Sequence, residues 1–441
     1  MRNSVAVICI ILQSFLAASC QPNPSGSSDA DGVLRIDLEP HIGRSDTLKA
    51  SDYFASVEYI PLETDSLYFV GNNPLVRLYR DTLILSFGQS GGKCFAFNLR
   101  GSFLHAIGRY GKGEGEYRQA GSYRLNEYSG ELYFQGWASG SYVKYDLQGN
   151  YRGSVTLMES GLRMGMIAST AGPMTFVTQQ DVALYHPVMP MGKQPSSQLL
   201  SFCRENDTTL QGAFRNPRIT ALIPFEKITN FSMMGGEAER TWGILGRDGG
   251  ISLKTGDDKE YYGFYGTSYF WKYNDFTYFK ECFNDTAYRI SSRKLEPRLI
   301  FNLGSYHWPY DKMFMYSTYA ASSAYVTWVT ETPELVLFQY FHNREVYNGV
   351  YRKSDRTVVS SPLLQGIQDD INGFLSHRIM TITPEGDLVS LVQPLAILAW
   401  FEENSGKAAR LPEQLKRLRN ISEEANPVVV VMRIKRKKFN L

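Results

Sequence analysis

The sequence contains few of the residues on which metal sites, disulfide frameworks and nucleic-acid interfaces depend. Its 441 residues include only five cysteines and six histidines, and the formal net charge is +2. The cysteines form no CxxC pair and the histidines no HExxH motif, so the usual patterns of zinc sites and disulfide-stapled modules are missing. A net charge this small provides no global attraction to nucleic acid. We therefore expect no metal, no other cofactor and no nucleic-acid partner.

Long apolar stretches and helix-forming charged segments are equally scarce. The apolar run near the start, residues 5–16, is too short to span a bilayer comfortably. Charged segments typical of α-helices are rare before residue 405. Aromatic residues are abundant instead, at 13% of the chain, with 28 tyrosines and 25 phenylalanines. Because aromatic side chains favour half-buried strands, the composition predicts an all-β fold.

The first 45 residues have the layout of an export signal followed by a tether. A positively charged start, the apolar run and small residues at 17–19 are typical of a secretory signal, predicted to span residues 1–19. The sequence LAASC ending at Cys20 resembles the lipobox of bacterial lipoproteins, which implies acylation of Cys20 and a membrane partner reached through lipid. Gln21 stands where inner-membrane lipoproteins carry Asp, so we expect a cell-envelope address as an outer-membrane lipoprotein, periplasmic or surface-exposed. Residues 20–45 are predicted to form a flexible tether, since residues 21–31 are rich in Pro, Ser, Gly and Asp.

One internal repeat indicates the architecture. Residues 97–103 (FNLRGSF) match residues 145–151 (YDLQGNY) position for position, 48 residues apart. This spacing is close to the length of a propeller blade. Short strands separated by turn residues surround both copies. They are predicted at 75–79, 82–87, 94–99 and 103–107, and again at 123–126, 131–135, 142–147 and 151–157.

Four short strands for each 48 residues are typical of a β-propeller. Further strand sets are predicted at 164–214, 268–304, 324–362 and 374–392, whereas 228–254 fits either a blade fragment or a long excursion. We therefore predict that residues 46–441 form a six-bladed β-propeller of four-stranded blades. The three cysteines of this region, Cys94, Cys203 and Cys282, are expected to be buried as small apolar residues.

The chain changes character after residue 394. Residues 395–403 and 408–421 are predicted to be helical, within a short helical insertion at about 395–424 that precedes the C-terminal strand. Leu411, Leu415 and Leu418 follow a helical period. The apolar stretch 428–434 then predicts a closing strand. We expect it to pair with residues 57–62 in one composite blade, because a ring tied shut by both ends of the chain exposes no strand edge.

Three segments supply candidate ligand-binding residues. A glycine-rich loop at 108–117 would cross from the outer edge of one blade to the centre of the next, and an aromatic-rich segment spans 261–279. The third segment, 369–372, is acidic, although it is more typical of a turn than of a metal site. We expect most of the aromatic residues to be core, and Asp285 to cap its own backbone turn. The candidates are Arg109, Lys112, Glu116, Tyr117, Trp271, Tyr273, Asp370 and Asn372.

Five segments carry a family resemblance. They are VEYIPLE at 57–63, IGRYGKGEGEY at 107–117, NDTAY at 284–288, DDING at 369–373 and ANPV at 425–428. In this order the chain resembles the six-bladed β-propeller lipoproteins of Gram-negative anaerobes, which are related to NHL-repeat and TolB-like propellers. The resemblance implies a propeller fold and export. It implies little about a ligand, because most of that family has no assigned biochemical function.

No catalytic constellation is present in the sequence. The GxSxG match at 88–92 lies between two predicted strands, whereas the serine nucleophile of hydrolases needs a strand-to-helix turn. We therefore expect a recognition module that binds a glycan, peptide or protein, with no catalytic residues. Two alternatives stay open: a propeller lyase or hydrolase whose carboxylates meet only in space, and an accessory subunit of an outer-membrane complex.

Overall fold

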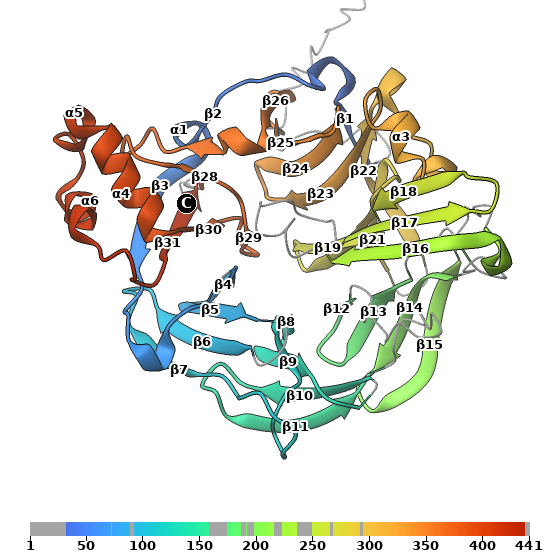
Figure 1. Cartoon of the computed structure of the whole chain (residues 1–441), viewed down its shortest axis with the longest axis horizontal. Coiled ribbons are helices and arrows are strands. Elements are labelled where there is room, and N and C mark those ends of the chain that lie inside the picture. Colours follow the sequence, from blue (N-terminus) through green and yellow to red (C-terminus); the bar gives the residue numbers. More distant parts are fainter. Residues whose placement is uncertain are drawn as a thin grey trace, which may run out of the picture.

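The fold is a ring of small antiparallel sheets (Figure 1). The computed structural model describes residues 32–71, 73–88, 92–138, 140–157, 174–186, 191, 198–215, 223–235, 249–264, 268–291 and 294–436. The predicted signal and the predicted lipidation site Cys20 lie outside the described residues. Among the described residues, no helix is long and apolar enough to cross a membrane.

The two sheets that contain the sequence repeat have the predicted strands. The first consists of β4 (Leu75–Tyr79), β5 (Thr82–Phe87), β6 (Lys93–Asn98) and β7 (Phe103–Ala106). The second consists of β8 (Gln119–Asn126), β9 (Glu131–Gln135), β10 (Ser141–Tyr145) and β11 (Tyr151–Thr156). In both, the first strand in the chain lies nearest the centre of the ring and the last lies outermost (Figure 1).

Three further sheets continue the ring in the same way. One contains β12 (Met174–Phe176), β13 (Asp181–Tyr185), β14 (Gln198–Arg204) and β15 (Asp207–Arg215). The next contains β19 (Ser268–Tyr273), β20 (Phe276–Glu281), β21 (Thr286–Ile290) and β22 (Leu295–Asn302). The third contains β23 (Ala324–Glu331), β24 (Leu335–His342), β25 (Glu345–Arg352) and β26 (Thr357–Pro362).

The predicted pairing of the two ends of the chain is confirmed. The closing sheet has the order β29 (Thr381–Ile382), β30 (Leu388–Val392), β31 (Val428–Ile434) and β3 (Phe54–Pro61). β3 and β31 are antiparallel, with Val57 opposite Met432. Arg433 on β31 donates to Glu58 on β3 at 3.1 Å and to Asp387 before β30 at 3.0 Å. These bonds join three strands that are far apart in the sequence.

Each sheet of the ring packs its apolar face against the next one. Phe279 of β20 lies against Tyr185 of β13, and Val429 of β31 lies in one cluster with Leu85 of β5. Further clusters join the remaining neighbouring pairs, so the sequence of contacts returns to the sheet where it began. The arrangement is propeller-like. Cys94, Cys203 and Cys282 are buried, as predicted.

The segment that the sequence left undecided forms a separate three-stranded sheet. It contains β16 (Ile228–Gly235), β17 (Gly249–Thr255) and β18 (Glu260–Phe264). Ile251 and Leu253 pack in one cluster with Trp308 and Phe314, which follow β22. Since β13 and β14 contact β20 and β21 directly, this sheet does not separate its neighbours in the ring, which agrees with the interpretation as an excursion.

The sequence repeat has a local structural cause. Asn98 Oδ1 accepts from the backbone N–H groups of Arg100 and Ser102, and Asp146 Oδ1 accepts from those of Gln148 and Asn150. Such Asx turns tighten the hairpin between the third and fourth strands of each sheet. The following Gly101 and Gly149 have φ of 84° and 80°, a conformation that other residues rarely adopt.

The helical insertion differs in detail from the prediction. α4 (Pro394–Glu403) is a helix as expected, but the predicted helix over 408–421 is wrong. Its place is taken by α5 (Ser405–Ala408), α6 (Glu413–Lys416) and the 3-10 turn η7 (Arg417–Asn420). Pro412 precedes α6, and a proline has no N–H to continue a preceding helix. Leu411, Leu415 and Leu418 are nevertheless buried, as their spacing predicted.

Part of the predicted tether is structured. β1 (Leu34–Asp37) adds a fifth strand, parallel to β22, on the outer edge of its sheet. Leu34 and Ile36 are buried while the residues between and after them are exposed. The predicted tether of residues 20–45 is therefore wrong for residues 34–37, which form a strand with one buried face. β2 (Leu48–Lys49) likewise pairs with β27 (Ile367–Gln368), which also pairs with β28 (Ser376–His377).

Candidate ligand-binding site

The glycine-rich loop follows the predicted course from the outer strand β7 to the inner strand β8 (Figure 1). Gly108 and Gly115 have φ of 64° and 73°. A Cβ atom on Gly108 would lie 2.7 Å from the ring of Tyr145 and 2.9 Å from that of Tyr117. Glycine is therefore required there both for its backbone conformation and for the close approach of two aromatic rings.

Tyr117, a predicted ligand-binding residue, is instead part of the core. Its side chain is only 1% exposed and stacks on Phe134, with ring centroids 4.7 Å apart. Its hydroxyl donates to the carbonyl of Gly92 at 3.3 Å. Burial raises the pKa of this phenol. A buried, bonded tyrosine anchors the loop and cannot meet a ligand.

Arg109 and Glu116, also predicted, form a pair that holds the loop in shape. Arg109 Nε lies 2.6 Å from Glu116 Oε1, and the Gly113 N–H donates to Glu116 Oε2 at 2.7 Å. The backbone hydrogen bond from Gly113 and the charge of Arg109 lower the pKa of Glu116. The carboxylate is thus committed to the loop, whereas the Arg109 side chain remains 80% exposed.

Lys112 belongs to an exposed cluster that the sequence did not reveal as a whole. Trp137, in the loop between β9 and β10, is 43% exposed, and its indole N–H donates to the carbonyl of Gly111. Lys112 Nζ lies 5.0 Å from the centre of the Trp137 ring and Arg118 Cζ lies 6.0 Å from it. Tyr110, 42% exposed, is 6.0 Å away, centroid to centroid. We call Tyr110, Lys112, Arg118 and Trp137 the Trp137 platform.

The Trp137 platform is positively charged on an aromatic base. Among the described residues, neither Lys112 nor Arg118 forms an ion pair. A cation beside an indole face is attracted to it, yet keeps most of its charge available to a ligand. The glycine-rich loop made Lys112 a candidate, whereas Trp137 was not one, because 26 residues separate Trp137 from its partner Gly111. An isolated tryptophan in the sequence Gly-Trp-Ala-Ser was the available signal.

Trp271 and Tyr273, two of the candidate ligand-binding residues, do not form a binding surface. Trp271 is 5% exposed and stacks on Tyr278, with ring centroids 5.3 Å apart. Tyr273 is half-buried beneath Lys353, whose Nζ lies 4.6 Å from the ring centre. Lys353 in turn pairs with the buried Glu331 at 2.7 Å. Both rings serve the packing of β19 against β23, as alternation along a strand predicts for most aromatic residues of this segment.

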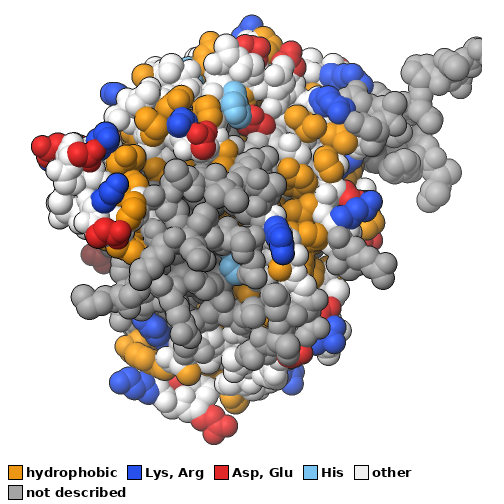
Figure 2. Space-filling model, turned by 90° about the vertical axis from the view of Figure 1, so that its right-hand side faces the viewer, with side chains coloured by type: hydrophobic (Ala, Val, Ile, Leu, Met, Phe, Trp, Pro, Cys, Tyr) orange, Lys and Arg blue, Asp and Glu red, His pale blue; other side chains and the backbone are white. Residues whose placement is uncertain are grey.

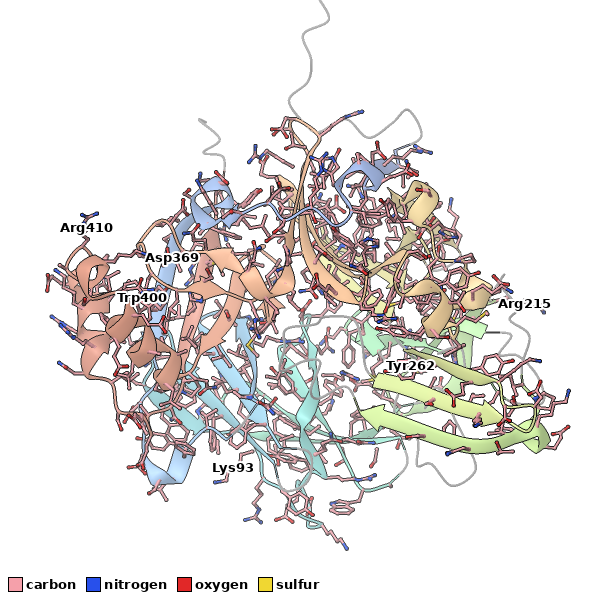
Figure 3. All side chains as sticks on the ribbon, turned by 45° about the horizontal axis from the view of Figure 1, so that its top comes forward. Lys93, Arg215, Tyr262, Asp369, Trp400 and Arg410 are labelled. Carbon is pink, nitrogen blue, oxygen red and sulfur yellow. The ribbon has the colours of Figure 1, made fainter. Side chains whose placement is uncertain are left out.

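Asp370 and Asn372 are likewise used within the protein. Asp370 accepts from the backbone N–H of Ser51 at 2.8 Å, and Asn372 Nδ2 donates to the carbonyl of Val57 at 3.0 Å. Asn372 also donates to Asp369, which is buried. Figure 3 shows Asp369 on the same side of the ring as Trp400 of α4. These residues fasten the segment after β27 to the short helix α1 (Ala50–Tyr53) and to β3, which accounts for them without a ligand.

A buried Tyr–Asp–His arrangement adjoins them. The Tyr59 hydroxyl lies 2.8 Å from Asp369 Oδ2 and 2.7 Å from His377 Nε2. A hydroxyl has one proton. If the Tyr59 hydroxyl donates that proton to the Asp369 carboxylate, then its oxygen must accept a hydrogen bond from the Nε2–H group of His377. His377 is 1% exposed, and burial lowers its pKa to about 3. Since the imidazole is shut off from solvent, we assign this arrangement to stability.

Lys280 and Glu281 form a second buried charged centre. The Lys280 ammonium donates to four backbone carbonyls, those of Glu281, Cys282, Asn284 and Val326, at 2.8–3.4 Å. Glu281 Oε1 accepts from Tyr185 at 2.9 Å and Tyr310 at 2.6 Å. Lys280 and Glu281 end the largely apolar strand β20 just before the Asn-Asp-Thr turn. Two charged residues at the end of such a strand were the signal of this centre in the sequence. The predicted Asx turn is present, but Asn284 rather than Asp285 accepts from the Thr286 N–H.

Metal binding has no support in the described part of the chain. No group of three His, Cys, Asp or Glu side chains there is arranged to hold a metal ion. On the side of the molecule shown in Figure 2, the coloured Lys and Arg side chains are scattered among acidic and hydrophobic ones. That distribution differs from the continuous basic stripe typical of nucleic-acid-binding surfaces.

Comparison with known proteins assigns a family. Residues 33–433 match the model of a family described as "Domain of unknown function (DUF4934)". The chain belongs to the DUF4934 family. No curated protein sequence matches it significantly.

Two solved structures of Bacteroides proteins align with most of this chain, and the first shows a similar fold. One, from Bacteroides fragilis and predicted to be an exported protein, aligns with 92% of this chain and 99% of its own at a TM-score of 0.59 and 15% identity. Another, a DUF4221-family protein from Bacteroides vulgatus, aligns with 87% of this chain and 97% of its own at a TM-score of 0.40 and 10% identity. At 15% identity, the similarity to the Bacteroides fragilis protein concerns the fold alone.

Proposed function

We propose that this DUF4934 protein is an exported, lipid-anchored recognition module that binds a glycan, peptide or protein ligand through the Trp137 platform. The observation that carries the proposal is the exposure of Trp137 while its N–H is bonded to Gly111. A ring held in place loses little conformational freedom when a ligand covers it. The adjacent cations, without carboxylate partners among the described residues, supply polar contacts.

The proposed architecture is a six-bladed β-propeller of the kind that NHL-repeat and TolB-like proteins have. It is supported by the sheets that begin with β4, β8, β12, β19, β23 and β29, which pack on one another in that order. The sheet of β16 to β18 is then an excursion between the third and fourth blades. Ligands of propellers often meet the loops on one face of the ring, which is where the glycine-rich loop lies under this proposal.

The proposed address is the outer membrane, through a lipid on Cys20. The signal-like first 19 residues and the lipobox-like sequence before Cys20 support it. The export predicted for the similar Bacteroides fragilis protein is consistent with it.

The position of β1 indicates where this tether would meet the ring. Because it runs parallel to β22, the tether reaches the ring at the face from which the outer strands start.

The Trp137 platform lies on the other face, where the outer strand β7 ends. The two sheets that carry the platform, β4 to β7 and β8 to β11, also lie across the ring from β1 and β22 (Figure 1). In the proposed protein the platform therefore faces away from the membrane. A recognition surface in that position is accessible to ligands in the surrounding space.

Thermal unfolding of residues 21–441 in the presence of glycan fragments, peptides and divalent ions tests the proposal. A ligand at a hundred times its Kd adds about 2.7 kcal/mol to the free energy of unfolding. We expect a stabilising ligand that is recovered unchanged, and loss of that stabilisation in Trp137→Ala. Phe276→Ala is the matched control, because Phe276 is 46% exposed and has Arg289 Cζ 4.8 Å from its ring centre. A ligand whose effect is equal in both variants would place the site elsewhere.

One observation favours an enzyme as the second candidate. His307 Nδ1 lies 2.6 Å from Asp285 Oδ2, and the His307 side chain is 46% exposed. A carboxylate that orients an accessible imidazole is a common arrangement for a general base. Consumption of a bound glycan or peptide by the wild-type protein, abolished in His307→Gln, would support this candidate. An intact ligand would support recognition.

A further inference from the structure

We propose that the Trp137 platform binds an acidic saccharide, a chain of uronic acid or sulfated sugar units. This inference rests on the proposed recognition function and specifies its ligand. The platform brings together the two features that would bind such a ligand. These are an accessible indole ring and two cations, Lys112 and Arg118, within 6.0 Å of its centre.

The aromatic surface suits a sugar better than a protein partner. A pyranose presents a flat face of C–H groups that covers one indole ring, while its hydroxyl groups stay at the polar edge. A stable protein interface buries about 800 Å² on each partner and has a continuous apolar centre. The exposed aromatic residues of this loop region, Tyr110, Trp137 and Tyr151, are separated by charged and glycine positions. This surface is sufficient for a few sugar units.

The charge selects an acidic sugar over a neutral one. The Glu116 carboxylate is already held by Arg109 and by the Gly113 N–H, so it does not neutralise the platform. Lys112 and Arg118 therefore present two positive charges beside Trp137. Apart from the paired Glu116, the exposed Glu114 is the only acidic residue of the loop. Carboxylate or sulfate groups on alternate faces of a saccharide chain would pair with these cations.

A membrane surface also binds aromatic and basic side chains, but the position of the platform argues against a membrane as its ligand. The tether joins the ring at β1, on the opposite side and at the opposite face from the platform. A lipid anchor at Cys20 would therefore hold the platform away from the membrane in which it is inserted. Binding to anionic lipid is kept as an outcome of the test.

Calorimetric titration of residues 21–441 with paired probes tests the inference. The acidic probes are oligogalacturonate, oligomannuronate and a chondroitin sulfate fragment. Fully methyl-esterified oligogalacturonate is the neutral match, because it keeps the sugar ring and removes the charge. We expect at least one acidic probe to bind, and the methyl ester to bind roughly tenfold more weakly than its acid. Raising the salt concentration should weaken only the acidic probe, since exposed charges are screened.

Variants locate the site. Trp137→Ala should weaken the acidic probe roughly tenfold or more, as expected for a central aromatic contact, and Lys112→Ala with Arg118→Ala should abolish the preference for the acid over its ester. Phe276→Ala and Arg410→Ala, an exposed aromatic and an exposed cation elsewhere, should leave both affinities unchanged. Circular dichroism of each variant establishes that the fold is retained.

The other outcomes overturn the inference in distinguishable ways. Equal binding of the acid and its ester, lost in Trp137→Ala, would make the ligand a neutral glycan and leave the recognition function standing. Binding of poly-glutamate or of phosphatidylglycerol vesicles, lost in the same variants, would replace the saccharide by a peptide or a membrane. If no acidic saccharide binds, the inference is wrong. The recognition function itself fails only if the broader thermal screen is also silent.

Discussion

At the scale of single residues, Asn426 shows how a side chain without any exposed surface determines the course of a loop. Its Oδ1 accepts from the Val70 N–H at 2.7 Å, and its Nδ2 donates to the carbonyls of Glu63 at 2.7 Å and Tyr68 at 3.2 Å. All three partners lie in the loop between β3 and β4. The amide thus replaces the strand partners that this loop lacks.

Asn426→Ala should lower the free energy of unfolding by about 2–4 kcal/mol, because it leaves buried backbone groups without partners. Urea denaturation measures the change. Asn404→Ala is the control, since Asn404 Nδ2 makes one bond, to the carbonyl of Trp400, at the end of α4. A loss in Asn426→Ala no larger than that in the control would contradict this role.

His377 predicts a pH dependence of stability. Its pKa is about 3 in the folded protein, because burial disfavours the charged imidazole, whereas the usual value is 6.5. Between these values the unfolded chain binds a proton that the folded protein does not, so stability falls as the pH is lowered from 6.5 towards 3. From pH 7 to pH 5 the loss should be about 2 kcal/mol.

Denaturant unfolding at pH 7 and pH 5 measures this effect against His377→Gln. Glutamine keeps an N–H that can donate to Tyr59 but does not titrate, so the variant should lose less stability over the same range. Carboxylates titrate mainly below pH 5 and contribute similarly to both proteins. Equal pH dependence in the two would show that another group is responsible.

At the scale of elements, the closure of the ring depends on the contact between β3 and β31. Arg433 binds Glu58 across this pair and Asp387 in the turn before β30. Arg433→Met should lower the free energy of unfolding by about 1–2 kcal/mol. The estimate is modest because Arg433 and Glu58 are 30% and 43% exposed and their ion pair is screened by water.

The loss in Arg433→Met should shrink in high salt, where the wild-type ion pairs are weaker. Arg410→Met removes an exposed arginine from the helical insertion and should be neutral. A neutral Arg433→Met would mean that the seven-residue strand β31 closes the ring through backbone bonds and apolar packing alone.

At the scale of the whole molecule, the position of β1 fixes how the proposed lipoprotein sits on a membrane. The 12 residues from 20 to 31 would span about 20 Å as a flexible chain. A domain of this size has a radius of gyration of about 21 Å. If this segment is a tether to the proposed lipid, we expect it to restrict the rotation of the ring and to keep the side near β22 closest to the membrane.

Quenching by spin-labelled lipids tests this orientation. Two fluorophores are compared on the full lipidated protein in vesicles, one at Lys294→Cys beside β22 and one at Lys112→Cys on the Trp137 platform. The native cysteines of the described region are buried, which limits their labelling. We expect stronger quenching at position 294. Residues 21–441 without lipid should show none at either position, and stronger quenching at 112 would reverse the proposed orientation.

The sequence by itself determined many of the strands and much of their order. Alternating apolar residues and Asx turns are local features, so β4, β5 and β9 were predicted to the residue. The pairing of β3 with β31 was also accessible, because a ring needs a partner for each edge. The sheet of β16 to β18 was not, since it depends on packing against distant segments. The division of the insertion before α6 was missed although Pro412 marks it in the sequence.

The candidate site was decided by tertiary structure. From a sequence, Trp137 and Trp271 are equivalent tryptophans near strands, and Arg109 and Lys112 are equivalent cations on one loop. Folding buried Trp271 against Tyr278 and left Trp137 exposed, and it paired Arg109 with Glu116 while placing Lys112 over the indole. These differences arise from contacts between separate loops. A sequence records which residues are available, and only the fold determines which of them remain free to bind.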